Sequence, residues 1–207
     1  MQHSLVHIHQ QYLLIKDLSL PERLAFFQKN TTSISNFNNF ENTEEINFFT
    51  KLSLEHLATL MDKKQFIDVA NQANIYLRSL THNETKKVKS TAQKELYHEI
   101  LFIKSIADYN LKNYKQALTS FKLLVAEQPE NQNFKKWLHT LKHVKYSPVI
   151  NTAFKISMLV LLIALLVRSY FNSPLFRIII VLIPLLSLLL TAIFKIYLKN
   201  SYQKLNK

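Results

Sequence analysis

The apolar residues of this 207-residue chain follow two patterns, one periodic and one continuous. Through most of the first 147 residues they recur at the three- and four-residue spacing of amphipathic helices, as in Phe66, Val69, Ala70, Ala73, Tyr76, Leu77 and Leu80. Beyond residue 148 they form nearly unbroken runs. The chain is therefore predicted to be all-α, with a helical domain followed by two long apolar helices.

The periodic part predicts one short helix and then five amphipathic helices. The short helix begins at the capping sequence Ser19-Leu20-Pro21-Glu22 and ends at Phe27, and an asparagine-rich loop is expected over residues 30–42. The five longer helices are expected from Thr43 through Leu60, over 66–80, over about 88–112, from Tyr114 to Glu127 and over 134–144, the last running up to Ser147-Pro148. We expect three regions, at residues 1–42, 43–147 and 148–207.

The continuous part predicts a transmembrane hairpin. Between Arg177 and Lys195 lie 17 uncharged residues, which as a helix span about 25 Å, close to the ~30 Å hydrocarbon core of a bilayer. Only 12 uncharged residues lie between Lys155 and Arg168. Residues 149–171 are nevertheless long enough to span if these two cations extend toward opposite headgroup layers.

The orientation of the hairpin is predicted from its flanking charges. Residues 172–174, Asn-Ser-Pro, form the expected turn, because Pro174 disfavours helix at Ser173. Four lysines precede the hairpin and four follow it, whereas the turn is edged by two arginines. This bias places both termini in the cytosol. The first residues have no basic segment followed by an apolar run, so no secretory signal is expected.

Composition excludes several classes of function. The chain has no glycine and no cysteine, which excludes phosphate-binding glycine loops, dinucleotide folds, disulfides and thiolate metal sites. The histidine pairs His3/His7 and His139/His143 have helical spacing but no carboxylate at ligand spacing, so no metal site is expected. No nucleophile motif is present either. We predict neither an enzyme nor a cofactor.

The net charge of +12 is concentrated near the predicted membrane segments. Residues 151–207 hold seven basic and no acidic residues, which leaves 19 basic and 14 acidic residues for the first 150. Anionic lipid headgroups account for such a distribution. No partner nucleic acid is expected. The abundance of asparagine and lysine is typical of AT-rich genomes and favours a bacterial inner membrane, with an organelle membrane as the alternative.

Residues 105–129, SIADYNLKNYKQALTSFKLLVAEQP, place six residues at a characteristic spacing: Ser105, Leu111, Tyr114, Ala117, Phe121 and Pro129. In this the chain resembles the tetratricopeptide repeat family over about residues 98–131, with a degenerate second copy at 50–80. Lys104, Asp108 and Lys112 depart from the family pattern, and the core face of the helix is expected at Leu96, Ile100, Ile103 and Ala107. The resemblance implies antiparallel helical repeats that bind peptides in a groove.

A second apolar stripe on the same helix, Phe102, Ile106 and Tyr109, is the candidate binding surface. It either docks a protein partner or packs on the preceding helices. The basic helix at 132–146 has two interpretations as well, as a cap on the repeats or as a helix lying on the membrane.

Two functions are compatible with these features. The first is a membrane-anchored adaptor or assembly factor that binds protein partners, other membrane proteins among them, at the cytosolic membrane face. The alternative is a hairpin that oligomerises into a pore or membrane-perturbing effector under the control of the helical domain. Its helices would then pack through small or weakly polar residues, namely Ser157, Ala164, Ser187 and Thr191.

Overall fold

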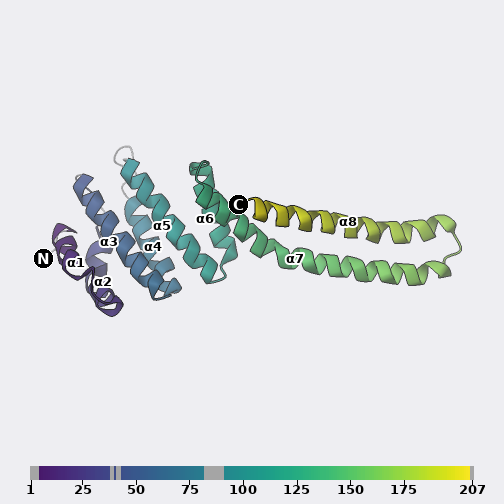
Figure 1. The fold of residues 1–207 in the computed structure, drawn as a ribbon, viewed down its shortest axis with the longest axis horizontal. Coiled ribbons are helices and arrows are strands. Elements are labelled where there is room, and N and C mark those ends of the chain that lie inside the picture. The colour runs from purple at the N-terminus through teal and green to yellow at the C-terminus, as the bar shows by residue number, and fades with distance from the viewer. Residues whose placement is uncertain (1–4, 38–39, 41–42, 82–90, 206–207) are drawn as a thin grey trace. The chain divides into compact units, whose positions relative to one another are not determined.

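The structure, a computed structural model, describes residues 5–37, 40, 43–81 and 91–205. Within these ranges every regular element is helical, as predicted (Figure 1). The helices are α1 (Leu5–Ile15), α2 (Leu20–Ser35), α3 (Thr43–Asp62), α4 (Phe66–Thr81), α5 (Thr91–Asn110), α6 (Tyr114–Glu127), α7 (Gln132–Val167) and α8 (Pro174–Leu205), with a short 3₁₀ helix, η2 (Arg168–Tyr170), after α7. Within α1 to α6, and again between α7 and α8, sequential helices pack antiparallel to one another.

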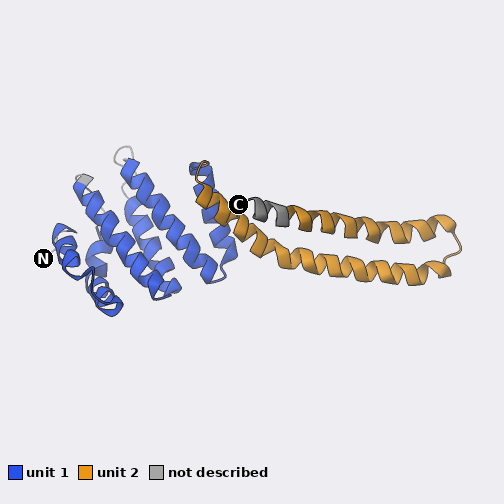
Figure 2. Ribbon diagram, in the orientation of Figure 1, with its two compact units in different colours: residues 1–128 blue, residues 129–207 orange. Residues whose placement is uncertain are grey.

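The chain forms two compact units, residues 1–128 and 129–207 (Figure 2). The first contains α1 to α6 and the second contains α7, η2 and α8. These limits differ from the expected regions 1–42, 43–147 and 148–207. The reason in the first unit is that α1 and α2 both pack against α3 and share its core.

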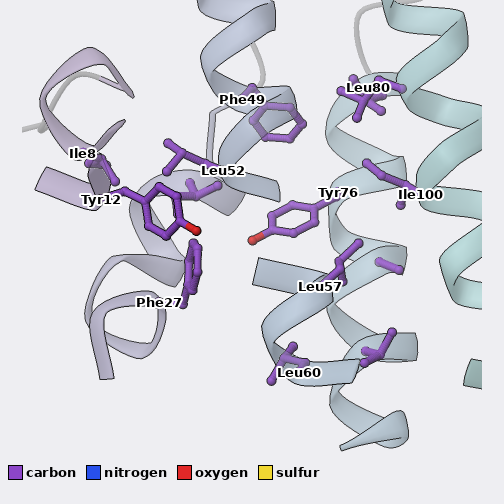
Figure 3. Packing of buried hydrophobic residues seen from close by; sticks show 14 of the residues in the cluster. Ile8, Tyr12, Phe27, Phe49, Leu52, Leu57, Leu60, Tyr76, Leu80 and Ile100 are labelled. Atoms are coloured by element: carbon purple, nitrogen blue, oxygen red, sulfur yellow. The ribbon is translucent and has the colours of Figure 1, made fainter. Parts of the chain in front are cut away.

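In the described part of the chain, four buried aromatic side chains lie among the mostly aliphatic residues of the core of the first unit (Figure 3). Tyr76 of α4 is fully buried and meets Phe49 of α3 edge to face, with ring centroids 5.6 Å apart. Phe27 of α2 lies 5.4 Å from Tyr12 of α1 by the same measure. On α5 the predicted core face is confirmed: Leu96, Ile100 and Ala107 are buried and Ile103 packs against the cluster.

Helix α2 corrects the expected loop over residues 30–42. The capping box is present, since the Ser19 backbone N–H donates to the Glu22 carboxylate at 3.0 Å. The helix then continues to Ser35 rather than ending at Phe27. Asn30 and Thr31 donate side-chain hydrogen bonds to backbone carbonyls one turn earlier, and Ile34 is fully buried. Residues 38, 39, 41 and 42 lie outside the described ranges.

Two turns in the first unit have the same geometry, the one between α3 and α4 and the one between α5 and α6. Lys64 and Lys112 occupy them with φ of 57° and 62°, in the left-handed region. Lys64 N–H donates to Met61 and the next N–H donates to Leu60; Lys112 and its successor donate to Tyr109 and Asp108 in the same pattern. Each helix pair therefore turns through a Schellman motif, with lysine in the position that usually holds glycine.

Helix α7 corrects the expected break at Ser147-Pro148. It is a single helix of 36 residues with Pro148 inside it, and it bends part-way along (Figure 2). A proline inside a helix removes one backbone donor, and its ring clashes with the carbonyl four residues earlier, so the helix kinks there. Asn131 begins α7 by accepting hydrogen bonds from two backbone N–H groups. The helix expected from about residue 88 is described from Thr91, because residues 82–90 lie outside the described ranges.

The turn of the second unit lies where the sequence predicts it. η2 ends at Tyr170, Phe171 to Ser173 form the connection, and α8 begins at Pro174. Proline suits the first helical position because its fixed φ is helical and it has no N–H to leave unpaired. α7 and α8 then pack along each other as an antiparallel pair, which we call the hairpin.

Candidate functional site

The inner side of the hairpin is lined by small residues. Ser157 and Ala164 of α7 are buried, and the Ser157 hydroxyl is 2.9 Å from the Ser187 hydroxyl of α8. Thr191 donates within its own helix, to the Ser187 and Leu188 carbonyls. The hydroxyls of these three residues therefore all have partners inside one chain.

The outer side of the hairpin is a large apolar surface. Leucine and isoleucine side chains remain exposed along both helices after they pack, Leu166 by 74%. Within the most apolar 18-residue window of each helix, only 17% of α7 and 6% of α8 is buried. Both helices are long and apolar enough to cross a membrane, by the criteria of length and composition. This agrees with the predicted pair of apolar helices.

The four predicted flanking charges lie at the two ends of this surface. Arg168 and Arg177 are close to the turn, where the Arg177 guanidinium donates to the Phe171 carbonyl. Lys155 and Lys195 are toward the opposite end, and the Lys195 ammonium lies 5.5 Å from the centroid of the Phe154 ring. This cation–π contact was not predicted. The tendency of helical side chains to lean toward the N-terminus of their own helix favours this contact once α7 and α8 are aligned, but the sequence does not give that alignment.

The predicted partner-binding stripe lies beside α6. Phe102, Ile106 and Tyr109 are all half-buried. Phe102 meets Phe121 edge to face at 5.8 Å between ring centroids, and Tyr109 is 5.9 Å from Tyr114 by the same measure. Each aromatic residue of the stripe therefore packs partly on α6 and keeps part of its surface accessible. Its role in binding stays a prediction.

Polar groups inside α5 explain two of the departures from the repeat pattern. The Lys104 ammonium is 2.7 Å from the carboxylate of Asp108, one turn later, and both side chains are nearly buried. The Ser105 hydroxyl donates to the Leu101 carbonyl and is fully buried. A lysine and an aspartate can occupy apolar positions here because each neutralises the other.

Two buried histidines make further polar contacts within the first unit, and the sequence analysis did not predict these contacts. His98 of α5 bonds to Glu127 through Nε2 and to Gln128 through Nδ1, the second contact at 2.8 Å. His56 of α3 is 2.8 Å from the Tyr76 hydroxyl and stacks on Phe27 at 4.7 Å between ring centroids. Burial lowers the pKa of His56 to about 4, so this imidazole is neutral at physiological pH.

In the part of the chain that the structure describes, no group of three or more histidine, aspartate or glutamate side chains is placed to hold a metal ion. His139 lies on α7, where burial and the nearby Lys142 lower its pKa. His7 contacts Gln11 at 2.9 Å. His3 lies outside the described ranges.

Comparison of the chain with protein-family models, characterised proteins and solved structures finds no match. The tetratricopeptide resemblance therefore stays a prediction.

Proposed function

We propose that this chain is a membrane-anchored adaptor or assembly factor, in which the hairpin is inserted in a bilayer and the first unit binds protein partners at the cytosolic face. The observation that carries the proposal is the exposed apolar surface of the hairpin, bounded by cations at both ends. A core helix of a soluble protein would bury that surface. An aqueous solvent would leave it as a site of aggregation.

The energetics of insertion favour a bilayer over water. Between Arg177 and Lys195, α8 contains 13 isoleucine, leucine, valine and phenylalanine residues. At about −0.3 to −0.6 kcal/mol each on the translocon insertion scale, they contribute on the order of −4 to −8 kcal/mol. Ser187 and Thr191 offset little of this, since both hydroxyls are hydrogen-bonded within the hairpin.

Charge supports a membrane location for the second unit in particular. Residues 129–207 hold 11 basic residues and one acidic residue, whereas residues 1–128 hold 15 and 13. The unit with the apolar helices thus carries +10 of the total +12. Cations near an anionic leaflet contribute about 1 kcal/mol each.

The adaptor role of the first unit is supported by its repeated turns. Lys64 and Lys112 are 48 positions apart and close two helix pairs, α3–α4 and α5–α6, through the same hydrogen bonds. When the two helix pairs are aligned on these lysines, Phe66 corresponds to Tyr114 and Val69 to Ala117. α5 also packs on both helices of the preceding pair. Stacked helix pairs are the architecture of solenoid proteins, whose exposed helix faces bind peptides and proteins.

Single cysteines test the insertion, because the natural chain has none to remove. Cysteine at Asn172 should react with a membrane-impermeant maleimide added to intact cells, whereas cysteine at Gln2 or Asn206 should react only after permeabilisation. Labelling at Asn206 but not at Asn172 in intact cells would refute the proposed topology. A photo-crosslinker at Phe102 or Ile106 should then capture protein from native membranes, and one at Lys122, an exposed position of α6 outside the stripe, is the control.

A further inference from the structure

The contact between Ser157 and Ser187 fixes how α7 and α8 are aligned in the hairpin. Arg168 lies 11 residues after Ser157 on α7, and Arg177 lies ten residues before Ser187 on α8. Since the helices are antiparallel, the two arginines are at nearly the same level. At the other end, Lys155 is two residues from Ser157 but Lys195 is eight from Ser187. The lysines are therefore staggered along the hairpin axis.

These positions set the height of the uncharged surface on each helix. The surface extends from Lys155 to Arg168 on α7 and from Arg177 to Lys195 on α8. At about 1.5 Å per residue these distances along the chain correspond to about 20 Å on α7 and about 27 Å on α8. Both are shorter than the ~30 Å hydrocarbon core of a typical bilayer.

Side-chain direction brings the two lysine charges to a common level. Side chains of a helix lean toward its N-terminus. On α7 this direction carries the Lys155 ammonium outward, away from the uncharged surface. On α8 it carries the Lys195 ammonium inward, and the contact with Phe154 shows that this side chain does fold back along the hairpin. With the helical rise as the measure, both charges thus lie about 25 Å or less from the arginine level.

From these levels we propose that the hairpin fits a bilayer whose hydrocarbon core is about 25 Å thick, thinner than average. The inference rests on the proposed insertion of the hairpin. Tilting accommodates a helix that is too long for the bilayer, because it reduces the height of the helix along the bilayer normal. The uncharged surface of this hairpin is too short, so tilting would make it fit worse. A thicker bilayer must thin around the hairpin or bring Lys155 into contact with acyl chains. Membranes of endoplasmic-reticulum thickness, about 27 Å, suit the hairpin better than plasma membranes of about 32–33 Å.

The test measures which acyl-chain length binds the hairpin best. The full-length chain carries Trp137→Phe and Leu186→Trp, which places the single tryptophan at an exposed, mid-height position of α8. The protein is reconstituted in monounsaturated phosphatidylcholine vesicles with acyl chains of 14 to 22 carbons. Quenching of its tryptophan fluorescence by brominated lipids then gives the relative constants with which lipids of each chain length bind the hairpin. We expect the shortest chains to be favoured over the longest by roughly threefold, since mismatch is a modest cost shared among the surrounding lipids.

Two variants make the test specific to Lys155. Lys155→Leu extends the uncharged run of α7 back to Tyr146, next to Lys145, so α8 becomes the helix with the shorter run and the preferred chain length should increase. Lys142→Leu removes a lysine outside the uncharged surface and should leave it unchanged. A preference for chains of 18 carbons or more, no preference at all, or equal responses of the two variants would overturn the inference while leaving insertion intact. Failure to float with any of the vesicles would overturn the proposed function itself.

Discussion

The two lysines in left-handed turns allow a sharp test of the fold. Lys64 and Lys112 have φ of 57° and 62° at the ends of α3 and α5. For a residue with a Cβ this conformation costs roughly 1–2 kcal/mol, whereas glycine adopts it freely and loses about 0.5–1 kcal/mol through greater freedom in the unfolded chain. Lys64→Gly and Lys112→Gly should therefore each stabilise the first unit, by about 0.5–1 kcal/mol.

The stabilising effects of the two substitutions should be additive, because the two turns share no hydrogen bond. For a unit of this size the double variant should melt roughly 3–8 °C higher. The measurement is the far-UV circular dichroism melt of the full-length protein in mild detergent. The matched control is Lys122→Gly, an exposed position inside α6, which should lose about 1 kcal/mol. If glycine at Lys64 or Lys112 destabilises as much as glycine at Lys122, these turns are not left-handed and the paired Schellman motifs do not exist.

Three further predictions concern the first unit. Residues 1–128 alone should give a soluble helical protein that melts cooperatively and is unaffected by chelators; an unfolded or zinc-dependent fragment would contradict the unit boundary. The pKa of His56 is about 4 in the folded chain and near 6.5 in the unfolded chain, so on acidification the unfolded chain is protonated first. The free energy of unfolding should therefore fall by up to about 3 kcal/mol as the pH is lowered from 6.5 to 4. Melting curves of His56→Phe should show a weaker pH dependence. The double substitution Phe102→Ala with Tyr109→Ala should lower the free energy of unfolding by about 3 kcal/mol or less, since both side chains are half-buried. It should nevertheless abolish crosslinking to partners. A much larger loss of stability would show that the stripe belongs to the core.

Local chemistry accounts for what the sequence predicts well. α6 begins at Tyr114 and ends at Glu127 as expected, because Asn113 and Pro129 lie just outside a regular apolar stripe. The hairpin turn is predictable for a similar reason, since Pro174 disfavours helix at Ser173 and suits the first position of the next helix. α2 was misjudged because asparagine and threonine usually favour turns, whereas Asn30 and Thr31 bond back into the helix.

Contacts between distant residues were beyond prediction. The apolar stripe of α4 indicates that Tyr76 is buried but not that its hydroxyl meets His56, 20 residues earlier. Tyr12 likewise reaches Glu55, 43 residues later, at 2.8 Å between hydroxyl and carboxylate oxygen. Periodicity identifies the face of a helix that is buried and says nothing of which helix covers it. The left-handed backbone conformation of Lys64 and Lys112 was not predicted because glycine usually occupies such positions.

The contact between Ser157 and Ser187 in the hairpin bears on both proposed functions. Inside the proposed bilayer a hydroxyl would have no water to bond, and the contact between Ser157 and Ser187 would satisfy both hydroxyls there. Sliding α8 by one helical turn, about 5.4 Å, would separate them and would also displace Arg177 from the level of Arg168. The alignment that satisfies the hydroxyls is thus the one that places two charges at the turn end and sets the height of the uncharged surface. Since Thr191 is bonded within α8, none of these hydroxyls needs a second copy of the chain. Under the proposed anchor role the hairpin therefore needs no second copy of the chain to satisfy these hydroxyls, whereas a pore would have to be built from an outer surface that is mostly leucine and isoleucine.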